Sequence, residues 1–390
     1  RGTTRALVKF YVATVALPYA VGVLVAVFWY DLFAVAYANR DFSPYERLLT
    51  QPRALWWYIG QWFAPDLTSL SVHHDDYVVS RTLNSPATTA WALIAGAVVS
   101  VMAVAARKKL KWFSFAVGWF LMAHAVESSF IPLEMMFEHR NYVPVFGLSL
   151  GTSMLVVQGA GYLGNSRLVT RTVATLVVLI VLGSTGLRAY EWGDLPRLVV
   201  ATAERQPSSL RAQGDLAQLL DAVQTDPAAT YRAYTRVSAL LPDSANQKMG
   251  MMRALARMEV RKTIGASKLP EKILSDDGQV LLDTSDAGLN AQWSRLGAAV
   301  EQRLGQPNLK VADLEGAQIL VRCFETNQPV CQRFRPWFTR WFNTALSNEA
   351  IGRHAHQTFH WLKARVMARD GRIDEALVAI GVAVAVDPTL

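Results

Sequence analysis

Residues 124–147, HAVESSFIPLEMMFEHRNYVPVFG, carry three glutamates, two histidines and one arginine between two apolar runs. Ionisable groups are costly near hydrocarbon, and in membrane segments they usually mark a functional site. The stretch therefore predicts a reactive surface where one membrane segment ends and the next begins. An ordinary interfacial loop is the alternative that composition leaves open.

The part of the chain that contains this stretch, residues 1–188, predicts a membrane domain. Predominantly apolar runs lie at about 10–30, 83–106, 112–133, 143–164 and 169–187. Each approaches the roughly 20 residues that a helix needs to cross a bilayer. A large soluble protein could contain one or two such runs in its core, but hardly five. We therefore expect an all-α protein that begins with a polytopic bundle of about five transmembrane helices embedded in the lipid bilayer.

Short basic segments set the orientation of these helices. Arginines and lysines precede the first run, follow the second at 107–111, and separate the fourth from the fifth at 167 and 171. The positive-inside rule places all three segments in the cytoplasm. The loops at about 31–82 and 127–142, and everything after 188, then lie outside. Because the chain opens Arg-Gly-Thr-Thr-Arg without Met or a lead-in to the first run, we expect it to be the C-terminal part of a larger protein.

The formal net charge of +8 does not indicate a nucleic-acid partner. Many of the cations flank apolar runs, and no basic stripe with interleaved aromatic residues is present. We therefore expect no nucleic-acid binding.

The first outer loop contains His73, His74, Asp75 and Asp76 in succession. Clusters of histidine and aspartate can bind a divalent metal, but adjacent residues on an extended chain point to opposite sides. A polar loop that lines a cavity is therefore favoured, and no metal site is assigned. The sequence leaves any cofactor open.

Residues 189–390 contain ordinary amphipathic helical patterns. The stretch 363–388 resembles a tetratricopeptide repeat, and a weaker copy has its helices at 217–222 and 231–241. The expected positions are Ala364 at the helix crossing, Gly371 in the turn, Ala376 and Ala383 in close packing, and Pro388 at the end. We expect an α-solenoid of degenerate repeats with a concave protein-binding surface.

The two cysteines of the chain, Cys323 and Cys331, both lie in this second part. An even number in an oxidising compartment favours a disulfide, which would close the loop 324–330. Two unrelated free thiols are the alternative.

The sequences ESSFIPLE at 127–134 and FEHRNYVP at 137–144, with RLLTQP at 47–52, now indicate a family. Together with a final apolar run and outward repeats, they resemble bacterial relatives of the transmembrane and tetratricopeptide repeat-containing O-mannosyltransferases, which belong to the GT-C superfamily. The resemblance covers about residues 40–240. It implies transfer of a sugar from a polyprenyl-phosphate carrier to a protein acceptor on the periplasmic side of a bacterial inner membrane. That family is expected to carry paired aspartates close after its first membrane helix. This chain has no such N-terminal stretch, and Asp75-Asp76 would lie in a later loop of the larger protein, so that role is not assigned to them.

The resemblance gives the polar stretch specific roles. Transfer from a lipid phosphate needs a cation for the departing phosphate and a carboxylate for the acceptor proton. Arg140, His139, Asn141 and Tyr142 are candidates for the phosphate. Glu127, Glu138 and His139 are the catalytic candidates, and Glu134, His124, His73, His74, Asp75 and Asp76 complete the polar set. His124 and Glu127 lie one turn apart on a helix face, where a contact between helices is the alternative role.

Two other functions remain open. An O-antigen ligase or polymerase would also use lipid-linked sugars, although outward repeats favour a protein acceptor. A non-catalytic membrane scaffold would use the repeats to recruit periplasmic partners.

Overall fold

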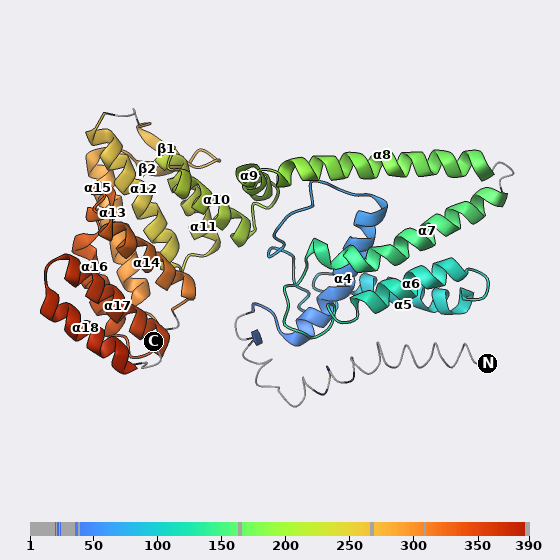
Figure 1. Cartoon of the computed structure of the whole chain (residues 1–390), viewed down its shortest axis with the longest axis horizontal. Coiled ribbons are helices and arrows are strands. Elements are labelled where there is room, and N and C mark those ends of the chain that lie inside the picture. Colours follow the sequence, from blue (N-terminus) through green and yellow to red (C-terminus); the bar gives the residue numbers. More distant parts are fainter. Residues whose placement is uncertain are drawn as a thin grey trace. The chain divides into compact units, whose positions relative to one another are not determined.

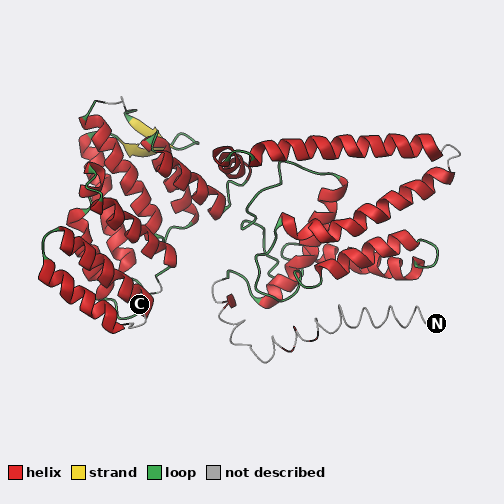
Figure 2. Cartoon of the chain, viewed as in Figure 1, coloured by secondary structure: helices red, strands yellow, loops and turns green. Residues whose placement is uncertain are grey.

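The computed structural model describes residues 36–37, 40–162, 166–265, 269–307 and 309–386, together with residues 20, 22 and 24. These residues are mostly helical (Figures 1 and 2). The chain divides into two compact units, residues 1–209 and 210–390, and each is described by itself. The predicted span at about 10–30 lies almost entirely outside the described residues, as does Pro388.

The first unit is built from α4 (Pro44–Phe63), α5 (Thr88–Ala106), α6 (Lys111–His124), the 3-10 helix η2 (Glu138–Asn141), α7 (Tyr142–Tyr162), α8 (Ser166–Trp192) and α9 (Leu195–Arg205). Within the described ranges, three helical segments are long and apolar enough to cross a membrane: Thr88–Ala106, Glu138–Gly161 and Arg167–Trp192. They coincide with the apolar runs predicted at 83–106, 143–164 and 169–187. The second, fourth and fifth predicted runs are therefore helices of membrane-spanning character.

The third predicted run behaves differently. A helix over 112–133 is wrong in its length, because α6 ends at His124 after 14 residues and the chain up to Phe137 is irregular. Fourteen residues rise about 21 Å, less than the hydrocarbon thickness of about 30 Å. The carbonyl groups that would have continued the helix instead accept hydrogen bonds from Arg47, as described below.

Two glycines one turn apart bring α7 close to α6. A Cβ atom on Gly147 would lie 2.6 Å from Cδ1 of Trp119. A Cβ atom on Gly151 would lie 2.5 Å from the Cβ of Ala116 and 2.8 Å from the carbonyl oxygen of Trp112. Small residues at this spacing are typical of helix pairs in membranes, because they let backbones approach closely. The Gly147–Gly151 pair therefore fixes the α6–α7 crossing.

Gly151→Ala should destabilise the protein by about 1–3 kcal/mol, because the new methyl group meets backbone that cannot rotate away. Gly159→Ala on the same helix is the matched control, since a Cβ atom there meets nothing within 4 Å. Thermal unfolding in detergent should show a lower midpoint for the first variant only. Equal midpoints for both variants would contradict close α6–α7 packing at Gly151.

The second unit contains α10 (Leu210–Val223), α11 (Pro227–Leu240), α12 (Ala245–Thr263), α13 (Asp286–Leu304), α14 (Val311–Glu325), α15 (Pro329–Gln332), α16 (Arg335–Leu346), α17 (Arg353–Arg369) and α18 (Ile373–Val386). Neighbouring helices pack from α10 to α13 and from α16 to α18, and α12 also packs against α14, α13 against α16, and α14 against α17. Phe324, Phe338 and Trp341 are buried in the shared core. Cys323 and Cys331 lie at disulfide-bonding distance, with Cα atoms 5.5 Å apart, which confirms the predicted pair.

One element departs from the all-α prediction. Strands β1 (Lys272–Leu274) and β2 (Val280–Asp283) pair antiparallel, with Ile273 opposite Leu282. Gly278 lies between them with a φ of 83°, a conformation that glycine adopts without steric cost. The Asp277-Gly278 dipeptide between two apolar runs is a hairpin signal, so this sheet was readable from sequence.

The last two helices form the hairpin that the repeat pattern predicts. Gly371 has a φ of 77° in the turn between α17 and α18, where its amide donates to the Ala368 carbonyl. Ala364, Ala376 and Ala383 are all buried. Their small side chains let the two helices lie close together, as expected from the sequence.

Candidate functional site

A cleft of about 590 Å³ lies at the N-terminal end of α7 in the first unit. It is lined by Ser71, Val72, Phe137, Glu138, His139, Asn141, Tyr142, Val145 and Trp192. Four of the predicted site residues, Glu138, His139, Asn141 and Tyr142, therefore line one cavity. The end of α8 and the loop before α5 complete its wall.

The irregular segment 125–137, which leads to this cleft, is held by one arginine of α4. Arg47 is fully buried and, among the described residues, donates to main-chain carbonyls and to no side chain. Its Nε donates to Ser129 (2.9 Å), its Nη1 to Leu133 (2.7 Å) and Glu134 (3.0 Å), and its Nη2 to Glu127 (2.7 Å). Burial lowers the pKa of Arg47 to about 10, which leaves the guanidinium charged at neutral pH. Arg47 thus shapes the segment through backbone contacts alone.

A tyrosine of α4 fixes the last residue before η2. The Tyr58 hydroxyl donates to the Phe137 carbonyl (2.8 Å) and accepts from the Phe137 amide (3.0 Å). Burial raises the pKa of Tyr58 to about 12, so the hydroxyl keeps its proton. His124 stacks on the Tyr58 ring at 5.2 Å and is itself buried, in the core rather than in the cleft lining. Asn141 donates weakly to the Tyr58 carbonyl (3.4 Å).

Tyr58→Phe should leave both backbone groups of Phe137 without their partner. An unsatisfied buried polar group costs about 1–3 kcal/mol, so the variant should lose about that much stability. Chemical unfolding of the purified protein measures this loss. Tyr45→Phe is the control, because Tyr45 is largely exposed. A Tyr58→Phe protein as stable as the control would show that the hydroxyl does not hold Phe137.

Glu138 is the carboxylate of the cleft, and three residues from two segments contact it. Its Oε1 accepts from the Ser71 amide (2.5 Å) and lies 3.2 Å from Nε2 of the buried His74. Its Oε2 lies 3.6 Å from Nη2 of Arg188 near the end of α8. Arg188 also binds Glu191 (2.9 Å). A network of alternating charges therefore orients Glu138 and keeps a cation beside it.

Arg140, assigned by sequence to the donor phosphate, does not line the cleft. Its Nη1 donates to the Glu134 carbonyl (2.5 Å), and its Nε lies 3.6 Å from Oε2 of Glu127. Its guanidinium also lies over the Phe137 ring, 5.2 Å from the centroid, and its side chain is only 9 % exposed. Glu134 in turn forms an ion pair with Arg40. Arg140, Glu127 and Glu134 thus form a second polar group that stabilises the segment behind the cleft.

His139, in contrast to Arg140, belongs to the wall of the cleft. It is exposed, lines the cleft, and stacks on the Phe137 ring at 5.1 Å. The stacking on Phe137 therefore orients the imidazole ring at the edge of the cleft. Tyr142, 82 % exposed, stands beside it at the start of α7.

The histidine and aspartate cluster of the outer loop divides between different partners. His74 faces Glu138, whereas Asp75 accepts from the Ser209 hydroxyl (2.5 Å) and Asp76 from that of Ser208 (2.9 Å). The amide of His73 contacts the Ser71 hydroxyl (3.4 Å). Across the described ranges, no three histidine, cysteine, aspartate or glutamate side chains group so as to hold a metal ion.

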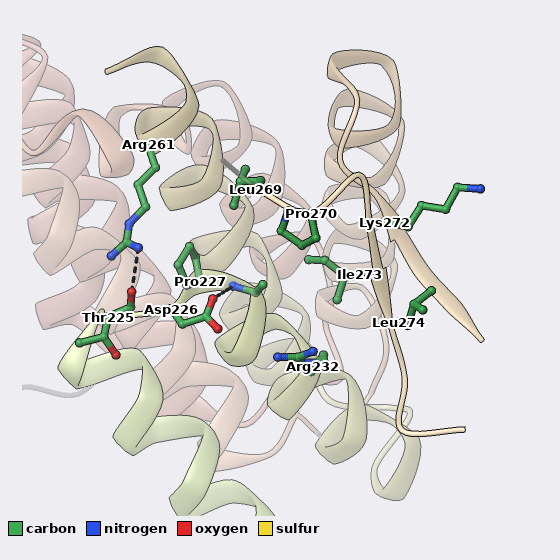
Figure 3. A pocket seen from close by; sticks show the side chains of 11 residues that line it. Thr225, Asp226, Pro227, Arg232, Arg261, Leu269, Pro270, Lys272, Ile273 and Leu274 are labelled. Atoms are coloured by element: carbon green, nitrogen blue, oxygen red, sulfur yellow. Dashed lines mark hydrogen bonds between the residues drawn. The ribbon is translucent and has the colours of Figure 1, made fainter. Parts of the chain in front are cut away.

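A second cavity, of about 530 Å³ in the second unit, offers no comparable chemistry (Figure 3). Arg261 is engaged with the carbonyls of Thr225 (2.7 Å) and Gln224 (2.6 Å), which end α10. Asp226 accepts from the Ala228 amide (2.8 Å) and so begins α11. Lys272 points away from the other labelled side chains. Arg261 and Asp226 therefore act as caps for the end of α10 and the start of α11.

Besides the cleft residues Ser71 and Trp192, sequence reasoning missed two arginines that organise the site. Arg47 was noted only as part of the RLLTQP motif, and Arg188 only as the end of the last apolar run. Arg47 has no acidic residue three or four positions away and Arg188 has Glu191 three positions later, so no shared local pattern marks the two arginines. Comparison with protein-family models, with curated proteins and with solved structures finds no match for this chain.

Proposed function

We propose that this chain is, or is part of, an integral-membrane glycosyltransferase of the GT-C type. It would transfer a sugar from a polyprenyl-phosphate carrier to a protein acceptor at the periplasmic face of a bacterial inner membrane. The observation that supports this most is the cleft at the start of α7, which combines a carboxylate and an imidazole at the end of a helix apolar enough to cross a membrane.

The cleft lies beside a second, apolar cavity. A neighbouring cavity of about 380 Å³ is lined by Trp119, Tyr142, Val143, Val145 and Phe146. Tyr142 and Val145 line both cavities. One face of the α7 start is therefore polar at one end and apolar at the other. This arrangement suits a lipid phosphate whose head lies near Glu138 and whose chain follows the apolar cavity.

The chemistry follows from the residues of the cleft. The start of α7 carries the positive end of a helix dipole, which favours an anionic group. His139 would donate a hydrogen bond to the departing phosphate. Glu138 would accept the proton of the acceptor hydroxyl while that oxygen bonds to the anomeric carbon and the sugar–phosphate bond breaks. The products are the glycosylated acceptor and the polyprenyl phosphate, and Arg188 keeps a positive charge beside Glu138.

Arg140 receives a different role in this proposal from the one that the sequence suggests. Because it is tied to Glu134, Glu127 and Phe137, it would hold the segment that presents Glu138 and His139. Its loss would then impair transfer through the geometry of the cleft.

The wider architecture belongs to the same proposal. We place five helices across the bilayer, one of them the run at 10–30. In this arrangement α6 crosses most of the bilayer, and the irregular segment 125–137 that follows it reaches the membrane surface. The second unit would be a tetratricopeptide-like solenoid in the periplasm that binds acceptor or partner proteins. The α10–α11 and α17–α18 helix pairs support the repeats, and the Cys323–Cys331 pair supports the periplasmic location.

A non-catalytic scaffold is the second candidate, and one observation favours it. Glu138 already has an amide, a histidine and an arginine as partners, which is also typical of a purely structural ion-pair network. A scaffold would bind no lipid phosphate in the cleft.

Photoaffinity labelling of the full protein in nanodiscs separates the two candidates. A polyprenyl phosphate with a diazirine in its chain should label residues 138–146 and Trp119, and excess unlabelled polyprenyl phosphate should abolish this labelling. Phe146→Ala should reduce it several-fold. Leu182→Ala should not, because Leu182 is an exposed apolar residue of α8 outside both cavities. If excess unlabelled polyprenyl phosphate does not reduce the labelling, the probe reports only its presence in the bilayer, and this result would contradict a donor site.

A further inference from the structure

The second unit contains a polar groove of about 540 Å³ to which α10, α12 and α14 contribute side chains. Its floor holds two arginines of α12 that share a single carboxylate. Arg253 Nε lies 2.9 Å from Oδ2 of Asp221, and Arg257 Nη1 lies 2.5 Å from Oδ1 of the same residue. Arg253 Nη2 also donates to the Tyr234 hydroxyl (2.9 Å). Two guanidinium groups thus face one carboxylate.

These groups carry a surplus positive charge and are largely buried. The side chains of Arg253, Arg257 and Asp221 are 4 %, 14 % and 14 % exposed. Nη1 of Arg253 is buried without a hydrogen-bond partner among the described residues. Unpaired charge is costly when removed from water, so a bound anion would relieve this cost. Elsewhere in the lining, the exposed Arg322 and Glu315 of α14 carry opposite charges, so together they add no net charge to the groove.

The rest of the lining indicates what kind of anion fits. Gln218, Asn246 and Gln247 bring amide side chains, each able to donate to and accept from a peptide backbone. Ile319, 44 % exposed, adds an apolar surface. A phosphate backbone would instead require several exposed cations, as nucleic acids and anionic lipid surfaces do.

We propose that this groove binds an extended polypeptide segment through an acidic side chain, whose carboxylate neutralises the surplus charge of Arg253 and Arg257. The inference rests on the proposed protein-binding role of the second unit and specifies its partner chemistry. It does not depend on sugar transfer, because donor and cleft play no part in the contact.

The test is a selection of randomised nonapeptides displayed on phage against the full protein in nanodiscs, without any donor. The wild type should enrich peptides with aspartate or glutamate at one position about tenfold over the unselected library. Arg257→Gln leaves Arg253 and Asp221 as a balanced pair, so the acidic enrichment should disappear. Arg257→Gln combined with Asp221→Asn leaves Arg253 as the surplus charge, so the enrichment should return.

Arg236→Gln is the matched control, since Arg236 pairs with the exposed Asp276 outside the groove and should leave the enrichment unchanged. Thermal unfolding verifies that each variant is folded. Absence of enrichment, enrichment of neutral or basic peptides, or acidic enrichment that survives in Arg257→Gln would each overturn the proposal. None of these results affects sugar transfer, which is measured separately.

Discussion

Arg47→Met should destabilise the first unit by about 3–5 kcal/mol and release residues 125–137 from their present path. The substitution removes four hydrogen bonds to main-chain carbonyls at once. Each carbonyl left buried and unpaired costs about 1–3 kcal/mol, and some will recover water as the segment opens, which limits the sum. Methionine keeps most of the side-chain volume, so the loss reports the polar contacts.

Arg47→Lys should recover only a part of this stability. Lysine retains the charge but lacks the planar fork that reaches carbonyls on several sides. Arg81→Met is the matched control, because Arg81 is exposed and its ion pair with Glu46 is worth at most about 1 kcal/mol. Urea unfolding and limited proteolysis within 125–137 measure both effects. If Arg47→Met is no less stable than Arg81→Met, Arg47 does not hold the segment.

Glu138→Gln should lower the rate of sugar transfer by about 10²- to 10⁴-fold, the usual contribution of a general base. Glutamine has nearly the same shape, and its oxygen can still accept from the Ser71 amide, so the protein should fold normally. Transfer from a polyprenyl-phosphate sugar, normalised to the amount of folded protein, gives the rate. Glu46→Gln is the control, since Glu46 belongs to the capping box of α4 and does not line the cleft. A normal rate for Glu138→Gln would remove Glu138 as the base.

Local patterns in the sequence predicted the regular elements well. The apolar runs at 83–106, 143–164 and 169–187 became helices because composition alone decides whether a segment of that length is helical in a membrane. The α17–α18 hairpin followed from small residues and Gly371, and the cysteine pair from its count and spacing.

Long-range contacts explain where prediction failed. The end of α6 at His124 depends on Arg47, about 80 residues earlier in the chain, and no local pattern records which carbonyls an arginine will reach. The β1–β2 hairpin was missed although Asp277-Gly278 marked its turn, because the surrounding helical pattern outweighed a short signal.

In the candidate site too, residues close together in the sequence were predictable and residues from distant segments were not. Glu138, His139, Asn141 and Tyr142 were predictable because they are neighbours in sequence at the start of one helix. Ser71 and Trp192 line the same cleft from distant segments, and no spacing rule connects them. Adjacency also misled, because Arg140 follows His139 directly yet is buried against Glu134 and Phe137.

The decisive experiment follows the fate of the lipid donor in the presence of the intact protein. Nanodiscs containing the protein are supplied with polyprenyl-phosphate mannose, or the corresponding glucose or galactose donor, and with periplasmic extract as the source of acceptor. Mass spectrometry then measures free polyprenyl phosphate and hexose-modified protein over time. We predict that both products appear together with the wild type, and that both fall at least a hundredfold with Glu138→Gln but not with Glu46→Gln. Donors that remain intact with the folded wild-type protein, or that are consumed equally by Glu138→Gln, would contradict a glycosyltransferase centred on this cleft.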